Sequence, residues 1–263
     1  MRFRFLAIPM AFSTFAGLTP LSAEKSGAYM EGGFQYSTML RGQGSSPVNA
    51  ATIAAEGGAA GGAYAMKGYA PIGSGPSSLY GNMYGLDAQI GYKQFFGKSK
   101  RFGIRYYVTF AWQHGTFYNG QTDLANFNYG GGADLLYNFF ESGDGVKTAG
   151  LFAGIALEGS SWLVAGQSGY TREMNFLNGG GAGPGFDVKM NTSYFQIPIN
   201  VGFRTNFTKH QGLEFGLRIP LATNYYYKQV YTPPKGVQSQ GGVQNEIMFK
   251  RNFSVYMNYV INF

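Results

Sequence analysis

The chain has 263 residues and a formal net charge of +7, yet charged residues make up only 13% of it. Soluble domains carry about 25% charged residues, whereas this chain is rich in aromatic residues (17%) and contains 41 glycines. The absence of cysteine excludes disulfides and thiolate metal sites, and the scattered basic residues form no stripe that would bind nucleic acid. This composition indicates one large all-β domain that faces lipid.

The N-terminus has the pattern of a secretory signal peptide. Positively charged residues precede a mostly apolar stretch from Phe5 to Leu18, and Leu21-Ser22-Ala23 then provides a small-residue cleavage pattern. The apolar stretch is shorter than the roughly 20 residues of a transmembrane helix. We therefore predict a signal peptide over residues 1–23 and a mature barrel over residues 24–263.

Large apolar residues alternate with small or polar ones along much of the chain. The clearest example runs from Phe102 to Trp112, and the same pattern occurs over Tyr84–Lys93 and Leu213–Leu221. A period of two predicts β-strands with two chemically different faces. A soluble β-sandwich also alternates and remains an alternative. The aromatic or aliphatic face on nearly every strand favours a transmembrane barrel, with one face toward lipid and the other toward the lumen.

Eight segments carry this alternation, so we predict an antiparallel up-and-down transmembrane β-barrel of eight strands. The predicted strands lie near 27–40, 80–96, 101–115, 128–140, 148–163, 191–206, 212–227 and 246–263. The long connections, predicted as extracellular loops, lie near 41–79, 116–127, 164–190 and 228–245. Short turns on one side and long loops on the other are typical of bacterial outer-membrane barrels. Segment 41–79 could hold a further hairpin, which leaves ten strands as an alternative.

Charged residues of the predicted strands fall mainly on the lumen face. Side chains just fill an eight-stranded barrel, and buried charges persist only when they are paired and hydrogen-bonded. Arg204 and Glu214 flank a short turn and are the pair expected first. The alternative is that several charges face water at the rims. The predicted lumen cluster is Glu31, Asp87, Asp134, Glu158 and Glu214 with Lys93, Arg105, Arg204, Arg218 and Lys250, completed by Gln35, Gln89, Asn138, Gln196, Asn200 and Asn258.

The last predicted strand has an apolar face that reaches the C-terminal residue. Tyr259, Ile261 and Phe263 alternate on this face. The pattern resembles the C-terminal strand that the outer-membrane assembly machinery recognises. We therefore predict these three residues as a membrane-insertion signal.

Three further segments resemble the Helicobacter outer-membrane protein family in their order and spacing. They are Lys25–Tyr36, Tyr194–Asn206 with its Gly-Phe-Arg-Thr-Asn block, and His210–Pro220 followed by Asn224-Tyr-Tyr-Tyr227. The chain lacks the long extracellular insertion of the family's large adhesins and so resembles a small, adhesin-related member. The resemblance implies a bacterial outer-membrane location, contact with outer-membrane lipid and lipopolysaccharide, insertion by the barrel-assembly machinery, and surface-exposed loops.

The sequence shows no catalytic constellation. His114 and His210 are the only histidines, and neither a metal-ligand pair nor a Ser-His-acid set is evident. We predict a non-enzymatic barrel, without metal or cofactor, whose loops contact the environment or a host surface ligand. A narrow or gated porin-like channel is the alternative, and a barrel enzyme acting on lipid or peptide is a third class.

Overall fold

The computed structural model describes residues 26–48, 77–97, 100–117, 123–142, 146–232 and 242–263. The predicted signal peptide and the central part of the predicted loop 41–79 lie outside these described residues. Within the described part of the chain, no helix is long and apolar enough to cross a bilayer.

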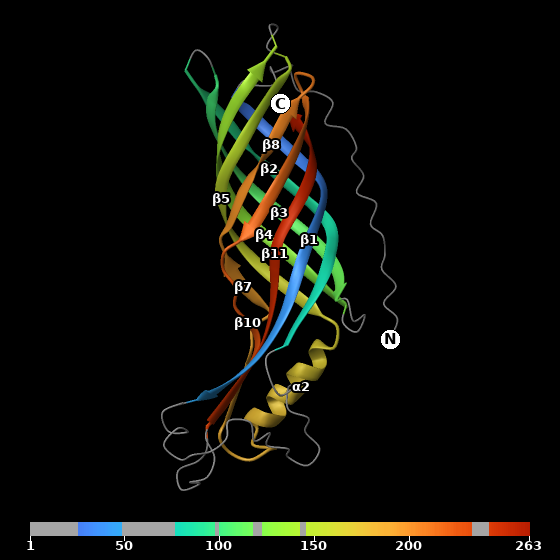
Figure 1. Cartoon of the computed structure of the whole chain (residues 1–263), viewed down its shortest axis with the longest axis vertical. Helices are drawn as coiled ribbons and strands as arrows, with labels where there is room; N and C mark the ends of the chain where they lie inside the picture. Colours follow the sequence, from blue (N-terminus) through green and yellow to red (C-terminus); the bar gives the residue numbers. More distant parts are fainter. Residues whose placement is uncertain (1–25, 49–76, 98–99, 118–122, 143–145, 233–241) are drawn as a thin grey trace.

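The described strands form one antiparallel sheet that closes into a barrel (Figure 1). The ring has eight strands in the order β1-β2-β3-β4-β5-β8-β9-β11, and β1 closes it by pairing with both β2 and β11. The predicted eight-stranded antiparallel barrel is therefore confirmed. The elements are β1 (Gly27–Val48), β2 (Ser77–Phe96), β3 (Phe102–Phe117), β4 (Asp123–Glu141), β5 (Thr148–Val164), α2 (Gln167–Asn178), β6 (Phe186–Met190), β7 (Ser193–Gln196), β8 (Pro198–Asn206), β9 (Gln211–Pro220), β10 (Tyr225–Tyr231) and β11 (Gly242–Asn262).

The two ends of the barrel differ in their connections. The connections β2–β3, β4–β5 and β8–β9 lie at one end together with the C-terminus, and we call this the turn end (upper end in Figure 1). There the Phe263 N–H donates to the Ala28 carbonyl at 3.0 Å. The opposite end, which we call the loop end, carries α2 between β5 and β6. An even number of strands places the start of β1 and the end of β11 on the same side.

One barrel strand continues from β6 through β7 into β8, and its neighbour continues from β9 into β10. Their pairing is interrupted near the loop end, where Pro198 pairs with Pro220. Proline has no backbone N–H to donate to a ladder. Pairing between the two strands resumes only where Met190 lies opposite Tyr227. The wall is therefore irregular at this height.

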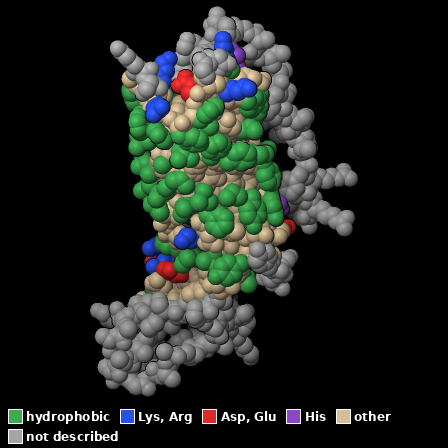
Figure 2. Space-filling model, turned by 45° about the horizontal axis from the view of Figure 1, so that its top comes forward, with side chains coloured by type: hydrophobic (Ala, Val, Ile, Leu, Met, Phe, Trp, Pro, Cys, Tyr) green, Lys and Arg blue, Asp and Glu red, His purple; other side chains and the backbone are tan. Residues whose placement is uncertain are grey.

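The outward face of the barrel is apolar between two polar rims, as Figure 2 shows. Leu86, Ile90, Val108 and Leu135 are between 55% and 69% exposed and belong to this band. A soluble protein rarely leaves so large a contiguous apolar surface in water, whereas an apolar band between polar rims suits a bilayer. The closed ring and this outward band exclude the soluble sandwich.

Several interior aromatic rings lie against glycines of a neighbouring strand. A Cβ added to Gly216 would clash with the Tyr256 ring, and one added to Gly202 would clash with the Phe152 ring. We expect Gly216→Ala to lower the free energy of unfolding by about 1–3 kcal/mol, because the ring must leave its position in a filled interior. Urea unfolding of the refolded protein in lipid vesicles measures this change.

Gly32→Ala is the matched control for this substitution. A Cβ at Gly32 would make only an ordinary van der Waals contact with the Asp87 carbonyl. Equal destabilisation by Gly32→Ala and Gly216→Ala would contradict the packing explanation.

Candidate functional site in the barrel interior

The barrel interior holds a buried cluster of charged side chains. Nine of the residues that the sequence places in the lumen expose 4% of their surface or less. They are Glu31, Asp87, Lys93, Arg105, Asp134, Glu158, Arg204, Glu214 and Arg218.

Lys250 is the exception, and its predicted lumen position is wrong. Phe253 and Arg251 pair with consecutive residues of β1, which leaves Asn252 as a β-bulge. A bulge inserts one residue and reverses the side-chain alternation beyond it. Arg251, which is 1% exposed, therefore faces the interior, and Lys250 points outward. The described interior still contains five acidic and five basic residues.

Arg105 lies at the centre of the tighter half of the cluster. Its guanidinium donates two hydrogen bonds to Glu214, at 2.6 and 2.7 Å. A third bond joins Nε to Asp134 at 2.8 Å, and Glu31 lies 3.6 Å from the same guanidinium. The bidentate pairing matches the planar donor fork of arginine. The Phe152 ring centroid lies 4.5 Å from the guanidinium carbon and adds a cation–π contact.

The predicted pairing of Arg204 with Glu214 is not the one that the Glu214 carboxylate makes in the structure. The two residues are cross-strand neighbours, but both Glu214 oxygens accept hydrogen bonds from Arg105, 109 residues away in the sequence. Arg204 instead donates to Asn138 and lies over the Phe95 ring, 5.3 Å from its centroid. A partner across the lumen therefore replaces the neighbour expected from the short turn.

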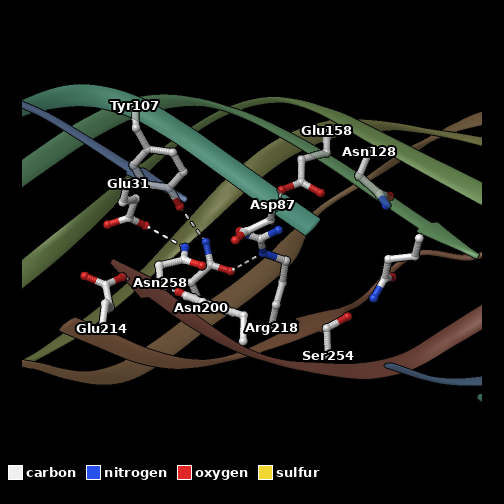
Figure 3. Close-up of polar contacts among 12 residues, drawn as sticks. Glu31, Asp87, Tyr107, Asn128, Glu158, Asn200, Glu214, Arg218, Ser254 and Asn258 are labelled. Atoms are coloured by element: carbon white, nitrogen blue, oxygen red, sulfur yellow. Dashed lines mark hydrogen bonds and ion pairs between the residues drawn. The ribbon is translucent and has the colours of Figure 1, made fainter. Parts of the chain in front are cut away.

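Arg218 lies at the centre of a looser half of the cluster, where the side chains of several strands converge (Figure 3). Its Nε donates to Asn200 at 3.1 Å. The carboxylates of Asp87 and Glu158 lie 3.5 and 4.0 Å from its guanidinium. Arg251 is also 4.0 Å from Glu158. These separations exceed those around Arg105, so the ionic contacts are weaker than short charge-assisted hydrogen bonds.

Neutral polar side chains complete the network. The amide residues Gln35, Gln89, Asn138, Gln196, Asn200 and Asn258, which the sequence places in the lumen, are all buried. One interior residue outside the predicted set is Tyr107, whose hydroxyl accepts a hydrogen bond from Asn200. Another is Ser37, which donates to Gln113 at 2.9 Å. Their only signal is strand parity, because each lies on the same face as the charged residues of its strand.

An apolar cluster, which we call the cap, fills the barrel at the loop end. The rings of Phe117, Trp162 and Tyr226 lie 6.0, 5.9 and 4.9 Å from the Phe249 ring. Leu177 of α2 belongs to the cap, so the helix packs against it. The interior is therefore polar in its middle and apolar toward the loop end. The cap consists of Met39, Met83, Phe117, Leu124, Trp162, Val164, Leu177, Val188, Tyr226, Tyr227, Ile247 and Phe249.

The residues of the predicted insertion signal lie at the turn end of β11. Tyr259 is 41% exposed, and Ile261 and Phe263 are half-buried. They alternate with the buried residues Val260 and Asn262 and therefore point away from the lumen. This outward face is open to lipid or to a protein that recognises the strand.

The two histidines lie far apart on the barrel. His114 is on β3 toward the loop end, whereas His210 is in the β8–β9 connection at the turn end, with Nδ1 3.0 Å from the Asn262 carbonyl oxygen. Among the residues that the structure describes, no group of three or more His, Asp or Glu side chains could hold a metal ion.

The strands that surround this interior, from within β2 to β11, match the model of a known family. The model of the Helicobacter outer membrane protein family matches residues 87–263, which is more than half of the chain. No curated protein sequence matches the chain significantly.

Three solved structures are also similar to this chain, at low sequence identity. The outer membrane protein OprG from Pseudomonas aeruginosa shares 10% identity over 91% of this chain and 97% of its own, with a TM-score of 0.45. Neisserial surface protein A shares 12% identity over 89% of this chain and 99% of its own, with a TM-score of 0.29. Ail, the attachment invasion locus protein of Yersinia pestis, shares 10% identity over 86% of this chain and 97% of its own, also with a TM-score of 0.29. These values are low, and the assignment rests on the family match. The predicted membership is confirmed: the chain belongs to the Helicobacter outer membrane protein family, and its barrel lies in the bacterial outer membrane.

Proposed function

We propose that this protein is a non-enzymatic, non-conducting barrel that anchors its loop end at the cell surface for contact with the environment or a host ligand. The observation that carries the proposal is the filled interior. The network around Arg105 and Arg218 occupies the middle of the barrel, and the cap fills the loop end. A pore needs a continuous column of water, and an eight-stranded barrel leaves room for little beyond its own side chains.

The attachment of α2 supports a role in surface display. The side chain of Asn178 donates to the Val188 carbonyl at 2.9 Å and accepts from the Val188 N–H at 2.8 Å, so it holds the end of α2 against β6. A helix fixed in this way presents a defined surface, and a partner would bind it with little further ordering cost.

Planar-bilayer conductance tests the non-conducting barrel. We expect the refolded full-length protein to carry no steady or gated current, with correct folding checked by its heat-dependent migration on a gel. A current that falls on substituting Asp87 or Arg218 would overturn the proposal, because it would show ions passing through the network.

Binding of whole bacteria to epithelial cells tests surface display. Arg172 and Phe176 are exposed on α2. We expect the double substitution Arg172→Glu with Phe176→Ser to reduce cell binding. The matched control is Phe207→Ser with Lys209→Glu, which changes the same residue types at the turn end. Unchanged binding for both, at equal protein levels in the membrane, would count against display through α2.

A gated channel is the second candidate function, and the looser half of the cluster favours it. Contacts of 3.5 and 4.0 Å around Arg218 oppose a rearrangement less than the short bonds of Arg105. Such a channel would stay closed at low voltage and conduct only after the cap had moved. A voltage-activated current that Asp87→Asn alters would favour this function over the non-conducting barrel.

A further inference from the structure

Residues 221–224 interrupt the barrel wall between β9 and β10. The ladder between β9 and β11 ends at Arg218, and the ladder between β10 and β11 begins at Tyr225. Within the described part of the chain, the backbone N–H groups of residues 222–224 donate to no protein acceptor, since the one bond here runs from the Leu221 N–H to the Ile197 carbonyl. Several backbone donors are therefore unused at one place in the wall.

The position of this segment relative to the bilayer follows from the hydrogen-bonding requirement of its backbone. Irregular backbone does not occur where it faces hydrocarbon, because nothing there satisfies its polar groups. Apolar residues such as Ile219 and Phe253, 36% and 37% exposed, lie on its membrane side. The ion pair of Lys228 with Glu246, at 3.1 Å, lies on its loop-end side. Residues 221–224 therefore lie between the apolar band and the charged pair, which is the level expected for outer-leaflet headgroups.

Lys250 lies on β11 beside the same segment. It falls between Met248, which pairs with Tyr225, and Ser254, which pairs with Arg218. Its side chain points outward, and its cross-strand neighbour on β1 is the apolar Leu40. A lysine stem can lie along such an apolar surface while its ammonium reaches the headgroups.

Of the cations that the structure describes on this face, Lys250 is the one without a carboxylate partner. Lys228 is paired with Glu246, and Lys189 is paired with Asp187 at 3.0 Å. Among the described residues, Lys250 has neither an ion pair nor a side-chain hydrogen bond. Its charge is available to an anion that approaches from the membrane.

We propose that Lys250 and the backbone N–H groups of residues 222–224 bind a phosphate group of an outer-leaflet lipid, namely a phosphorylated glycolipid of the lipid A class. An ammonium and several backbone N–H donors together form the chemistry that holds the acceptor oxygens of a phosphate. The apolar band on the turn-end side of the site would accommodate the acyl chains of the same lipid. This inference is independent of the role of the loop end.

Thermal stabilisation of the refolded full-length protein by added lipid tests the site. We expect bisphosphorylated lipid A to stabilise the protein, and we expect dephosphorylated lipid A with the same acyl chains, or inorganic phosphate alone, to stabilise it much less. Lys250→Gln should weaken apparent binding of phosphorylated lipid A about tenfold, the size of one lost charge-assisted hydrogen bond. Lys250→Arg should restore most of it.

Lys209→Gln is the control, because it removes the same charge in the exposed β8–β9 connection at the turn end. Equal stabilisation by phosphorylated and dephosphorylated lipid A would overturn the proposal, and so would equal weakening by Lys250→Gln and Lys209→Gln. Stabilisation by inorganic phosphate alone would show a phosphate site without a lipid source. If Lys250→Gln does not fold, the comparison of the two lipids on the unmodified protein still decides the question.

Discussion

Replacing Arg105 with methionine is expected to lower the free energy of unfolding of the barrel by about 3–5 kcal/mol, the usual cost of removing one partner of a buried ionic network. The substitution keeps an apolar stem but removes the guanidinium that binds Glu214 and Asp134. Both carboxylates are about 1% exposed, so water cannot replace the lost partner. Urea unfolding in lipid vesicles, followed by tryptophan fluorescence, measures the change.

Two comparisons separate this effect from a general sensitivity to charge. Lys189→Met removes a cation from an ion pair with Asp187 in which both side chains are 62% exposed. Exposed pairs contribute less than about 1 kcal/mol to stability, so we expect a much smaller loss from this substitution. The double substitution Arg105→Met with Glu214→Gln should lower the free energy of unfolding by less than the sum of the two single substitutions. The reason is that it also removes the Glu214 charge, which Arg105→Met alone leaves buried without its partner. Additive costs would contradict the direct pairing of these residues.

Replacing Phe249 with alanine is expected to cost about 3–5 kcal/mol of unfolding free energy, the range for deleting a fully buried aromatic ring. The ring is 1% exposed. It is the common neighbour of Phe117, Trp162 and Tyr226 in the cap. These side chains come from different strands and cannot all move inward to fill the cavity. The same urea titration measures the loss.

Phe253→Ala is the matched control on the same strand. Phe253 is 37% exposed on the outward face, where lipid chains can fill the space that its ring leaves. We expect a clearly smaller loss of stability from Phe253→Ala than from Phe249→Ala. Similar losses of unfolding free energy would show that the cap is not a packed core. That result would also contradict the proposal that the cap closes the loop end.

Strand parity explains why so much of the interior is visible in the sequence. The alternation from Phe102 to Trp112 places Arg105 on the lumen face, and the structure buries that residue while leaving Val108 64% exposed. A strand turns successive side chains to opposite faces, so a local pattern is enough to separate lipid-facing from lumen-facing residues. The terminal apolar face of Tyr259, Ile261 and Phe263 is visible for the same reason.

Parity fails where the backbone leaves its regular period. The bulge at Asn252 exchanges the roles of Lys250 and Arg251, and no local composition marks it. The interruption at Pro198 and Pro220 is different, because both prolines are visible in the sequence. Their consequence depends on register, since each weakens the wall most where it faces the other.

The sequence by itself determined the antiparallel strands, their two faces, nine of the ten buried charges and the family, because each depends on residue type at a short and regular spacing. Only the tertiary structure decided that Arg105 rather than Arg204 binds Glu214, and that β-strands and α2 bring a cap together around Phe249. Those contacts join residues that are distant in sequence and meet through the closure and stagger of the barrel. Their partners are set by the geometry of the closed ring rather than by any local pattern.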